Sequence, residues 1–280
     1  MPDNYTCAWT GSPGGACHFE YLPAVAPHRE NCYGCIATTA GPSRGYVCEP
    51  NLPTVPMSGT LPNVLIVGDS ISHGYFPVLS AAITGTVAQL QHAPSNTGTL
   101  AAGLDCWNIT TLLGASGALP KPWDLVVFNF GLHDTDEPTP PPMRTIGAAV
   151  VPTPASSHSV ANNMTLLRQY TEAGVLRSGR VRRGLRALTT PYMAGGVWRT
   201  LELMNANASA YMASVGIPEV DLWTPIVKHC GPLPYAYCDI CSGSTPGHPV
   251  AANFTPHYTA AGYALLVQAL VPAIKHALSQ

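Results

Sequence analysis

Charged side chains are scarce in this sequence. They make up 10% of the 280 residues, whereas a globular protein usually carries about 25%. The formal net charge is only −2. The basic surface that nucleic-acid binding requires is therefore missing, and we expect no nucleic-acid partner. Five arginines gather between Arg177 and Arg186, at the amino end of a predicted strand, and we interpret them as a solvated face.

An uninterrupted apolar run long enough to cross a membrane is also missing. The best candidate, Thr259 to Ile274, is short and contains Gly262, Gln268 and Pro272, whereas a spanning helix needs about 20 apolar residues. We therefore predict a buried C-terminal helix and no stable membrane insertion.

Cysteine, by contrast, is plentiful and unevenly distributed. Five of the nine cysteines lie in the first 48 residues, a stretch rich in Gly and Pro. Such a stretch buries little apolar surface, so disulfides are its expected source of order. We predict two units, a Cys-rich disulfide-stapled extension at 1–60 and a larger domain at 61–280. The nine are Cys7, Cys17, Cys32, Cys35, Cys48, Cys106, Cys230, Cys238 and Cys241.

The cysteine spacing leaves a choice between disulfides and metal. Two Cys-x-x-Cys pairs, Cys32/Cys35 and Cys238/Cys241, would suggest zinc in a cytosolic protein. Because other cysteines surround them, we favour disulfides and predict no metal site. We expect the extension to be cross-linked within itself and also to the C-terminal loop that carries Cys230, Cys238 and Cys241, and Cys106 to be the unpaired thiol.

The expected compartment is the secretory pathway. Cysteine usage indicates an oxidising environment, and N-x-[ST] sequons predict a glycoprotein. We expect the protein to be secreted, or to lie in the secretory lumen or at the cell surface. Met1-Pro2-Asp3 is a start that fits a trimmed leader. The sequons begin at Asn4, Asn108, Asn163, Asn207 and Asn253.

Short apolar runs alternate with helical stretches along residues 61–280. Buried strands are predicted at 63–68, 86–91, 124–130, 186–190 and 219–222, and helices at 74–83, 99–113, 159–177, 197–214 and 258–278. This alternation is typical of right-handed βαβ units. We predict an α/β fold of three α/β/α layers around a five-stranded parallel sheet, flavodoxin-like in its arrangement. Its ligand site is expected beyond the carboxyl ends of the strands.

Three polar motifs fall at that edge. The first strand runs directly into Gly68-Asp69-Ser70, and a Ser on a strand-to-helix turn has an exposed hydroxyl near a helix N-terminus. The third strand ends in Gly131-Leu-His133-Asp134. His257 stands just before the last helix, from which it can reach across the edge to Ser70.

These motifs resemble those of the SGNH hydrolases, also called GDSL-type esterases and lipases. The family has four blocks in order: a GDS-type Ser, a Gly after the second strand, a G-x-N-D after the third, and D-x-x-H before the last helix. Ser70, Gly98, His133 and His257 hold those positions. The resemblance implies that Ser70 attacks an ester carbonyl and His257 takes its proton. It assigns the oxyanion hole to Ser70, Gly98 and His133, and implies no cofactor.

The chain departs from the family pattern at two positions. His133 replaces the third-block Asn, and an imidazole N–H can still donate; Asn129 is the alternative donor. Phe254 stands where the fourth block has Asp, so the usual acid is missing. Of the other acids, Asp134, Asp221 and Asp239 are the candidates. We predict instead a Ser–His dyad in which a backbone carbonyl or Asn253 orients His257.

Each site residue also has a purely structural interpretation. Ser70 and His257 could cap helices, and His133 could be a buried, hydrogen-bonded histidine. His229 and His248 are alternative bases, and Gly103 is an alternative to Gly98.

At the level of function, the leading hypothesis is a serine esterase for small acyl esters, O-acetyl esters among them. The substrate would be a small molecule, or a carbohydrate or lipid ester. The alternatives are an O-acetyltransferase and a binding protein on a decayed hydrolase fold.

Overall fold

The structure is a computed structural model. It describes residues 60–93, 100, 123–135, 160–172, 181–193, 197–242 and 256–280, together with four short strands at 34–38, 45–49, 145–146 and 149–150.

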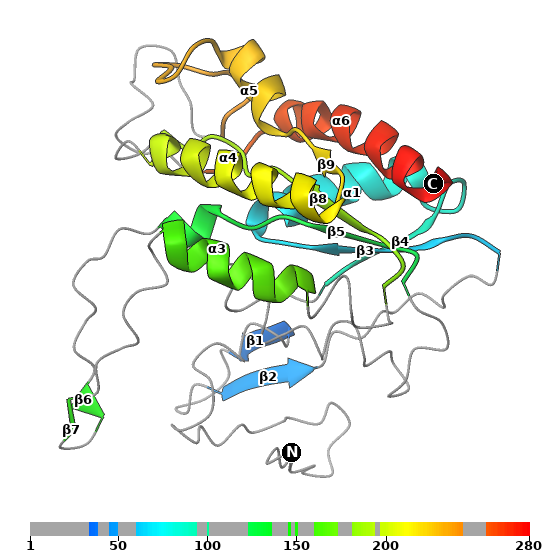
Figure 1. Ribbon diagram of the computed structural model, residues 1–280, viewed down its shortest axis with the longest axis horizontal. Helices are drawn as coiled ribbons and strands as arrows, with labels where there is room; N and C mark the ends of the chain where they lie inside the picture. The colour runs from blue at the N-terminus through cyan, green and yellow to red at the C-terminus, as the bar shows by residue number, and fades with distance from the viewer. Residues whose placement is uncertain are drawn as a thin grey trace.

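A five-stranded sheet with every strand parallel forms the centre of the molecule (Figure 1). Its spatial order, β4-β3-β5-β8-β9, is 2-1-3-4-5 in chain order, which is the flavodoxin-like order. The predicted fold class is therefore confirmed. The strands are β3 (Asn63–Val67), β4 (Gln89–His92), β5 (Leu125–Phe128), β8 (Gly184–Ala187) and β9 (Glu219–Val220).

Helices connect these strands. The predicted helices correspond to α1, α3, α4 and α6, and the predicted helix at 99–113 lies outside the described residues except for Leu100. The short helix α5 and the single 3-10 turn η2 were not predicted, because each is too short to show a clear period. The bounds are α1 (Ser70–Ile83), η2 (Leu132–Thr135), α3 (Val160–Gln169), α4 (Trp198–Val215), α5 (Trp223–Cys230) and α6 (Ala260–Ser279).

The sheet separates two hydrophobic cores. Val64 and Ile66 of β3 face one core, which α1 and α6 cover. Leu65 and Val67 face the other, to which α3 and the C-terminal half of α4 contribute. Successive strand side chains point to opposite faces, so an all-apolar strand serves both layers. This explains why β3 is an apolar run without alternation, buried along its whole length.

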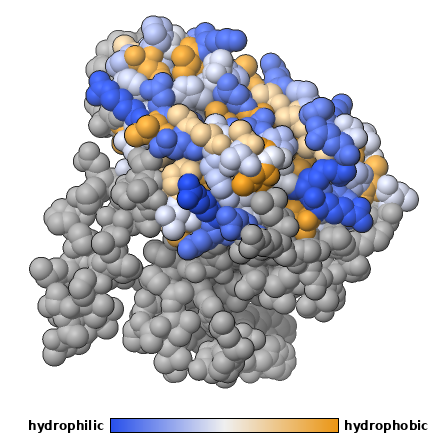
Figure 2. All heavy atoms as spheres, in the orientation of Figure 1, coloured by the Kyte–Doolittle hydropathy of each residue, from blue (hydrophilic) through white to orange (hydrophobic). Residues whose placement is uncertain are grey.

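A close helix contact fixes α1 beside α6. A Cβ added at Gly74 would lie 1.9 Å from Cζ of Tyr263, so the Tyr263 ring occupies the space that a larger residue at position 74 would need. By length and apolar composition α6 could cross a membrane. Leu266, Leu270 and Ile274 on one face of α6 are buried in the core, and 33% of its apolar window is buried in all. Figure 2 shows polar and apolar residues mixed over the described surface on that side.

Two small antiparallel hairpins lie outside the sheet. In the Cys-rich extension β1 (Gly34–Thr38) pairs with β2 (Gly45–Glu49), and in the Pro-rich loop β6 (Thr145–Ile146) pairs with β7 (Ala149–Val150). Neither hairpin was predicted. The rest of the extension and Cys106 lie outside the described residues.

Candidate active site

Ser70 is the first residue of α1, directly beyond the carboxyl end of β3. The preceding Asp69 caps the helix, because its Oδ1 accepts the Ile71 N–H at 2.9 Å. The turn also requires a glycine: a Cβ at Gly68 would lie 2.9 Å from Oγ of Ser72 and 3.0 Å from the Asn129 carbonyl oxygen. The Ser70 hydroxyl therefore lies at the positive, N-terminal end of α1. The turn before it is packed too closely to hold a side chain at position 68.

His257 lies opposite Ser70, with Nε2 at 2.8 Å from Oγ. Both residues are half-buried, so a substrate can reach them. Backbone bonds hold the histidine on each side, since its carbonyl accepts the Ser242 N–H at 2.9 Å and the Thr259 N–H donates to the Ile240 carbonyl at 2.8 Å. The structure thus brings together the two residues that the sequence predicted as nucleophile and base.

No carboxylate in the described part of the chain contacts His257. Asp134 accepts the Leu100 N–H at 3.1 Å, and Asp221 accepts the N–H groups of Trp223 and Thr224, each at 2.9 Å. Each of these acids is thus bound elsewhere.

The third candidate acid is likewise engaged, since exposed Asp239 pairs with Nε2 of His229 at 2.7 Å. His229, one of the alternative bases, is therefore bound away from Ser70. His248, Asn253 and Phe254 lie outside the described residues.

His133 stands in η2, half-buried, and its Nε2 is buried without a hydrogen-bond partner among the described residues. It lies close enough to Asp69 to act on it. Burial raises the pKa of the Asp69 carboxyl, and the attraction of His133 opposes that rise. Gly98 and Gly103 lie outside the described residues.

Asn129, the alternative oxyanion donor, has a structural role. It is buried, and its Nδ2 donates to the Leu188 carbonyl at 3.2 Å. Its backbone N–H donates to the Val67 carbonyl at 2.9 Å. Asn129 therefore joins the carboxyl ends of three neighbouring strands.

A buried polar network supports the third block from the β8 side. Asn205 of α4 accepts the Thr189 N–H at 3.1 Å and donates to the Thr189 carbonyl at 2.9 Å. It also accepts from Arg186, which pairs with Glu219. Thr189 in turn packs against Gly131. A Cβ added at Gly131 would lie 3.2 Å from Cγ2 of Thr189.

A second Ser–His pair, Ser72 and His92, escaped the sequence analysis. Ser72 Oγ lies 2.8 Å from Nε2 of His92, the same separation as in the Ser70–His257 pair. His92 Nδ1 lies 2.6 Å from the Ala93 carbonyl, so Nδ1 carries the proton. Burial and the neighbouring His73 lower the pKa of His92 to about 3. The sequence signal that could have pointed to this pair was His92, a polar residue at the end of the second strand.

The cysteines near His257 pair differently from the prediction. Cys230 and Cys238 form a disulfide, and Cys241 is a free, buried cysteine. Two of the three cysteines thus pair within the loop, and the predicted tie stays a prediction for Cys241, because the cysteine side chains of the extension lie outside the described residues.

Comparisons with known proteins support the fold. No family model matches the sequence, and no curated protein matches it. Among solved structures, a GDSL-like lipase from Bacteroides thetaiotaomicron VPI-5482 matches with a TM-score of 0.51 and 15% identity, covering 77% of this chain and 88% of that one.

A protein from Bacteroides fragilis NCTC 9343, assigned as an acylhydrolase, also matches with a TM-score of 0.51. It is 16% identical, and the match covers 81% of this chain and 92% of that one. The chain thus has the fold of the SGNH hydrolases, and the resemblance drawn from the motifs is confirmed at that level.

Proposed function

We propose that this protein is a serine hydrolase of carboxylic esters that works through an acyl-enzyme on Ser70. The observation that carries the proposal is the 2.8 Å separation between Ser70 Oγ and His257 Nε2 at the N-terminus of α1. A neutral imidazole at that distance can accept the hydroxyl proton as the oxygen attacks an ester carbonyl.

The remaining steps follow from the same pair. The attack places negative charge on the former carbonyl oxygen. The Ser70 N–H at the start of α1, with donors from Gly98 and His133, would stabilise that charge. His257 then returns the proton to the departing alcohol, and water, activated by the same imidazole, releases the acid.

The proton transfers of this mechanism do not require a carboxylate, because His257 both accepts the proton and returns it. In a Ser–His dyad a neutral acceptor fixes the tautomer of His257, and the imidazolium is stabilised less than in a triad. The described acids support this proposal, because Asp134, Asp221 and Asp239 are each bound elsewhere.

The finer proposal is that the acyl group is small, as in O-acetyl esters of a small alcohol, a carbohydrate or a lipid. Turnover of p-nitrophenyl acetate, butyrate and octanoate compares the acyl groups directly. We expect kcat/KM to be highest for acetate, and a maximum at octanoate would overturn the small-acyl proposal while leaving the esterase in place.

A fluorophosphonate probe tests the nucleophile, because it phosphonylates only an activated serine. We expect the wild type to be labelled and Ser70→Ala to remain unlabelled, with kcat on an acetyl ester reduced by at least about a thousandfold. Ser72→Ala is the matched control: Ser72 has the same 2.8 Å contact with a histidine but is fully buried.

Folding of each variant is checked by circular dichroism. Equal labelling of folded wild type and Ser70→Ala would refute the proposed mechanism. Labelling that disappears in a folded Ser72→Ala variant but persists in Ser70→Ala would transfer the role of nucleophile to Ser72.

A further inference from the structure

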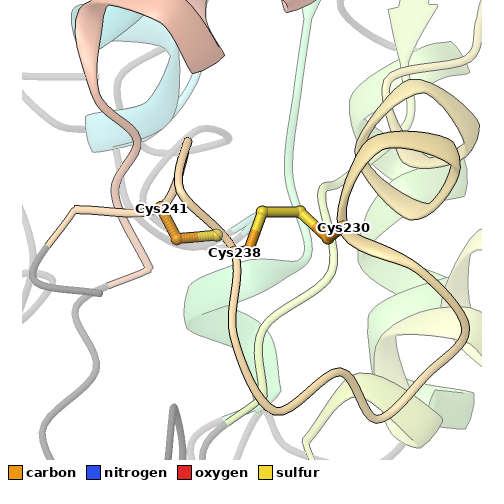
Figure 3. Close-up of side chains that lie close together, drawn as sticks. All are labelled: Cys230, Cys238 and Cys241. Carbon is orange, nitrogen blue, oxygen red and sulfur yellow. A yellow bond between two sulfur atoms is a disulfide. The ribbon is translucent and has the colours of Figure 1, made fainter. Parts of the chain in front are cut away.

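Three cysteine sulfurs converge beside the segment that carries His257. The Sγ atoms of Cys230, Cys238 and Cys241 all lie within 4.8 Å of one another. Figure 3 shows the Cys241 side chain directed toward the Cys230–Cys238 disulfide. A thiol is therefore next to a disulfide, which is the arrangement that thiol–disulfide exchange requires.

An alternative pairing is sterically available within this cluster. The Cys241 N–H donates to the Cys238 carbonyl at 3.1 Å, which closes a turn over residues 238–241. The end Cα atoms of such a turn lie less than about 7 Å apart. Disulfides usually join Cα atoms that are about 4.4–6.8 Å apart. Cys238 can thus pair with Cys241 as well as with Cys230.

We propose that these three cysteines form an internal thiol–disulfide exchange site, in which Cys241 attacks Cys238 and releases Cys230. The Cys241 thiol first loses its proton to solvent. Its thiolate then forms a bond to Cys238 Sγ while the bond between Cys238 and Cys230 breaks, and Cys230 leaves as a thiolate that takes up a proton. One disulfide and one thiol exist before and after, so no external oxidant or reductant is needed.

The surroundings of Cys241 set the rate of this step. Burial raises the pKa of its thiol to about 11; the Tyr235 hydroxyl at 3.8 Å acts against that rise, and the charge of Asp239 adds to it. Asp239 itself pairs with His229, and buried Tyr258 is the other titratable group facing the thiol. Only a small fraction of the molecules therefore holds the thiolate at neutral pH, and that fraction increases about tenfold per pH unit.

Exchange would change both the accessibility of the thiol and the support of the catalytic base. Cys241 is 4% exposed, whereas Cys230, at the end of α5, is half-buried. Exchange thus moves the free thiol to a more accessible position. Cys241 also forms a β-bridge with Tyr258, the residue after His257, so a disulfide within 238–241 would lie on the backbone that holds His257.

Disulfide mapping of the full chain tests the exchange without any assay of activity. Protein purified without reductant is incubated at pH 6, 7, 8 and 9, stopped in acid, unfolded, and labelled with N-ethylmaleimide at pH 5. Peptide mass mapping then locates the label. We expect it on Cys241 at pH 6 and increasingly on Cys230 after incubation at higher pH. The rate should rise about tenfold per pH unit, because it follows the thiolate fraction.

Cys241→Ser and Cys241→Ala are the control variants, and in neither should Cys230 become labelled. Label that stays on Cys241 alone through prolonged incubation of the wild type at pH 9 would overturn the proposal, whether or not the variants fold. So would Cys230 labelling at the wild-type rate in a folded Cys241 variant. Labelling of all three cysteines before incubation, with one zinc ion per chain, would instead identify a metal centre.

Discussion

Ser70 and Ser72 stand two residues apart, and each hydroxyl lies 2.8 Å from a histidine Nε2. Their different burial separates their roles. Ser70, the first residue of α1, is half-buried. Ser72 is fully buried, and its Oγ also lies 2.6 Å from the Asp69 carbonyl oxygen. The Ser72–His92 pair therefore joins α1 to the end of β4, and the half-buried Ser70–His257 pair is the one that we propose to be catalytic.

The dyad makes a prediction at this same scale. We expect Asp221→Ala and Asp239→Ala to keep kcat within about threefold of the wild type, while His257→Ala loses at least about a thousandfold. Asp134 needs the milder change Asp134→Asn, because its buried carboxylate accepts the Leu100 N–H and the amide oxygen can still accept it. In an enzyme with a Ser–His–Asp triad, changing the Asp to Asn lowers kcat about ten-thousandfold.

Steady-state kinetics on an acetyl ester, with folding checked for each variant, gives the answer. Any one Asp variant that loses as much activity as His257→Ala would establish a carboxylate triad and refute the dyad.

At the scale of elements, the segments that follow the carboxyl ends of β5 and β8 pack closely against each other. Gly131, three residues after β5, has φ of +135°, and Thr189, two residues after β8, packs where its Cβ would be. Asn205 of α4 holds Thr189 by two hydrogen bonds. The place of η2, and with it of His133, therefore depends on contacts from a distant strand and helix.

Gly131→Ala tests this junction. Because the change adds backbone strain and a tight contact with Thr189, we expect it to lower the free energy of unfolding by about 1–3 kcal/mol and to reduce kcat by displacing His133. Gly216→Ala is the matched control, since Gly216 also has a positive φ, +72°, but no atom lies within 4 Å of an added Cβ.

Urea unfolding and ester turnover of both variants decide the matter. We expect Gly216→Ala to lose stability but keep its kcat. A Gly131→Ala variant with the stability and kcat of the wild type would show that the fit between the two strand ends is unimportant.

At the scale of the whole molecule, buried His92 couples folding to pH. Its pKa is about 3 in the folded protein and about 6.5 in an unfolded chain. Between these values the unfolded chain binds a proton that the folded chain does not. The stabilising effect of His92 is therefore fully present above pH 6.5 and is lost as the pH falls toward 3.

We expect the free energy of unfolding to fall on acidification from pH 6.5 to 4.5, with His92 contributing up to about 1 kcal/mol per pH unit. His92→Gln should flatten this dependence. His276→Gln, at an exposed position of α6, should leave it as steep as in the wild type. Urea unfolding at three pH values measures the slopes, and equal slopes for the two variants would contradict the prediction.

Local patterns in the sequence were sufficient for the fold class and for the expectation that Ser70 and His257 lie together at one edge of the sheet. An apolar run such as 64–67, in a chain where strands and helices alternate, is typical of a strand buried on both faces of a parallel sheet. A Gly-Asp-Ser turn directly after such a run places Ser70 at the sheet edge, and a histidine before the last helix reaches the same edge. These inferences depend on periodicity and chain order, which neighbouring residues encode.

Tertiary structure alone decided which distant groups meet. Short elements such as α5 and η2 carry too few residues to show a period, and their place depends on packing. The partners of Asp134, Asp221 and Asp239, the buried Ser72–His92 pair and the disulfide between Cys230 and Cys238 all depend on distances between chain segments. The position of three cysteines shortly before His257 suggested a tie to the extension, but the sulfur that Cys230 reaches is set by how α5 ends against the following loop. The sequence shows which side chains are able to form bonds, but which of them form bonds with each other depends on the distances between segments in the folded chain.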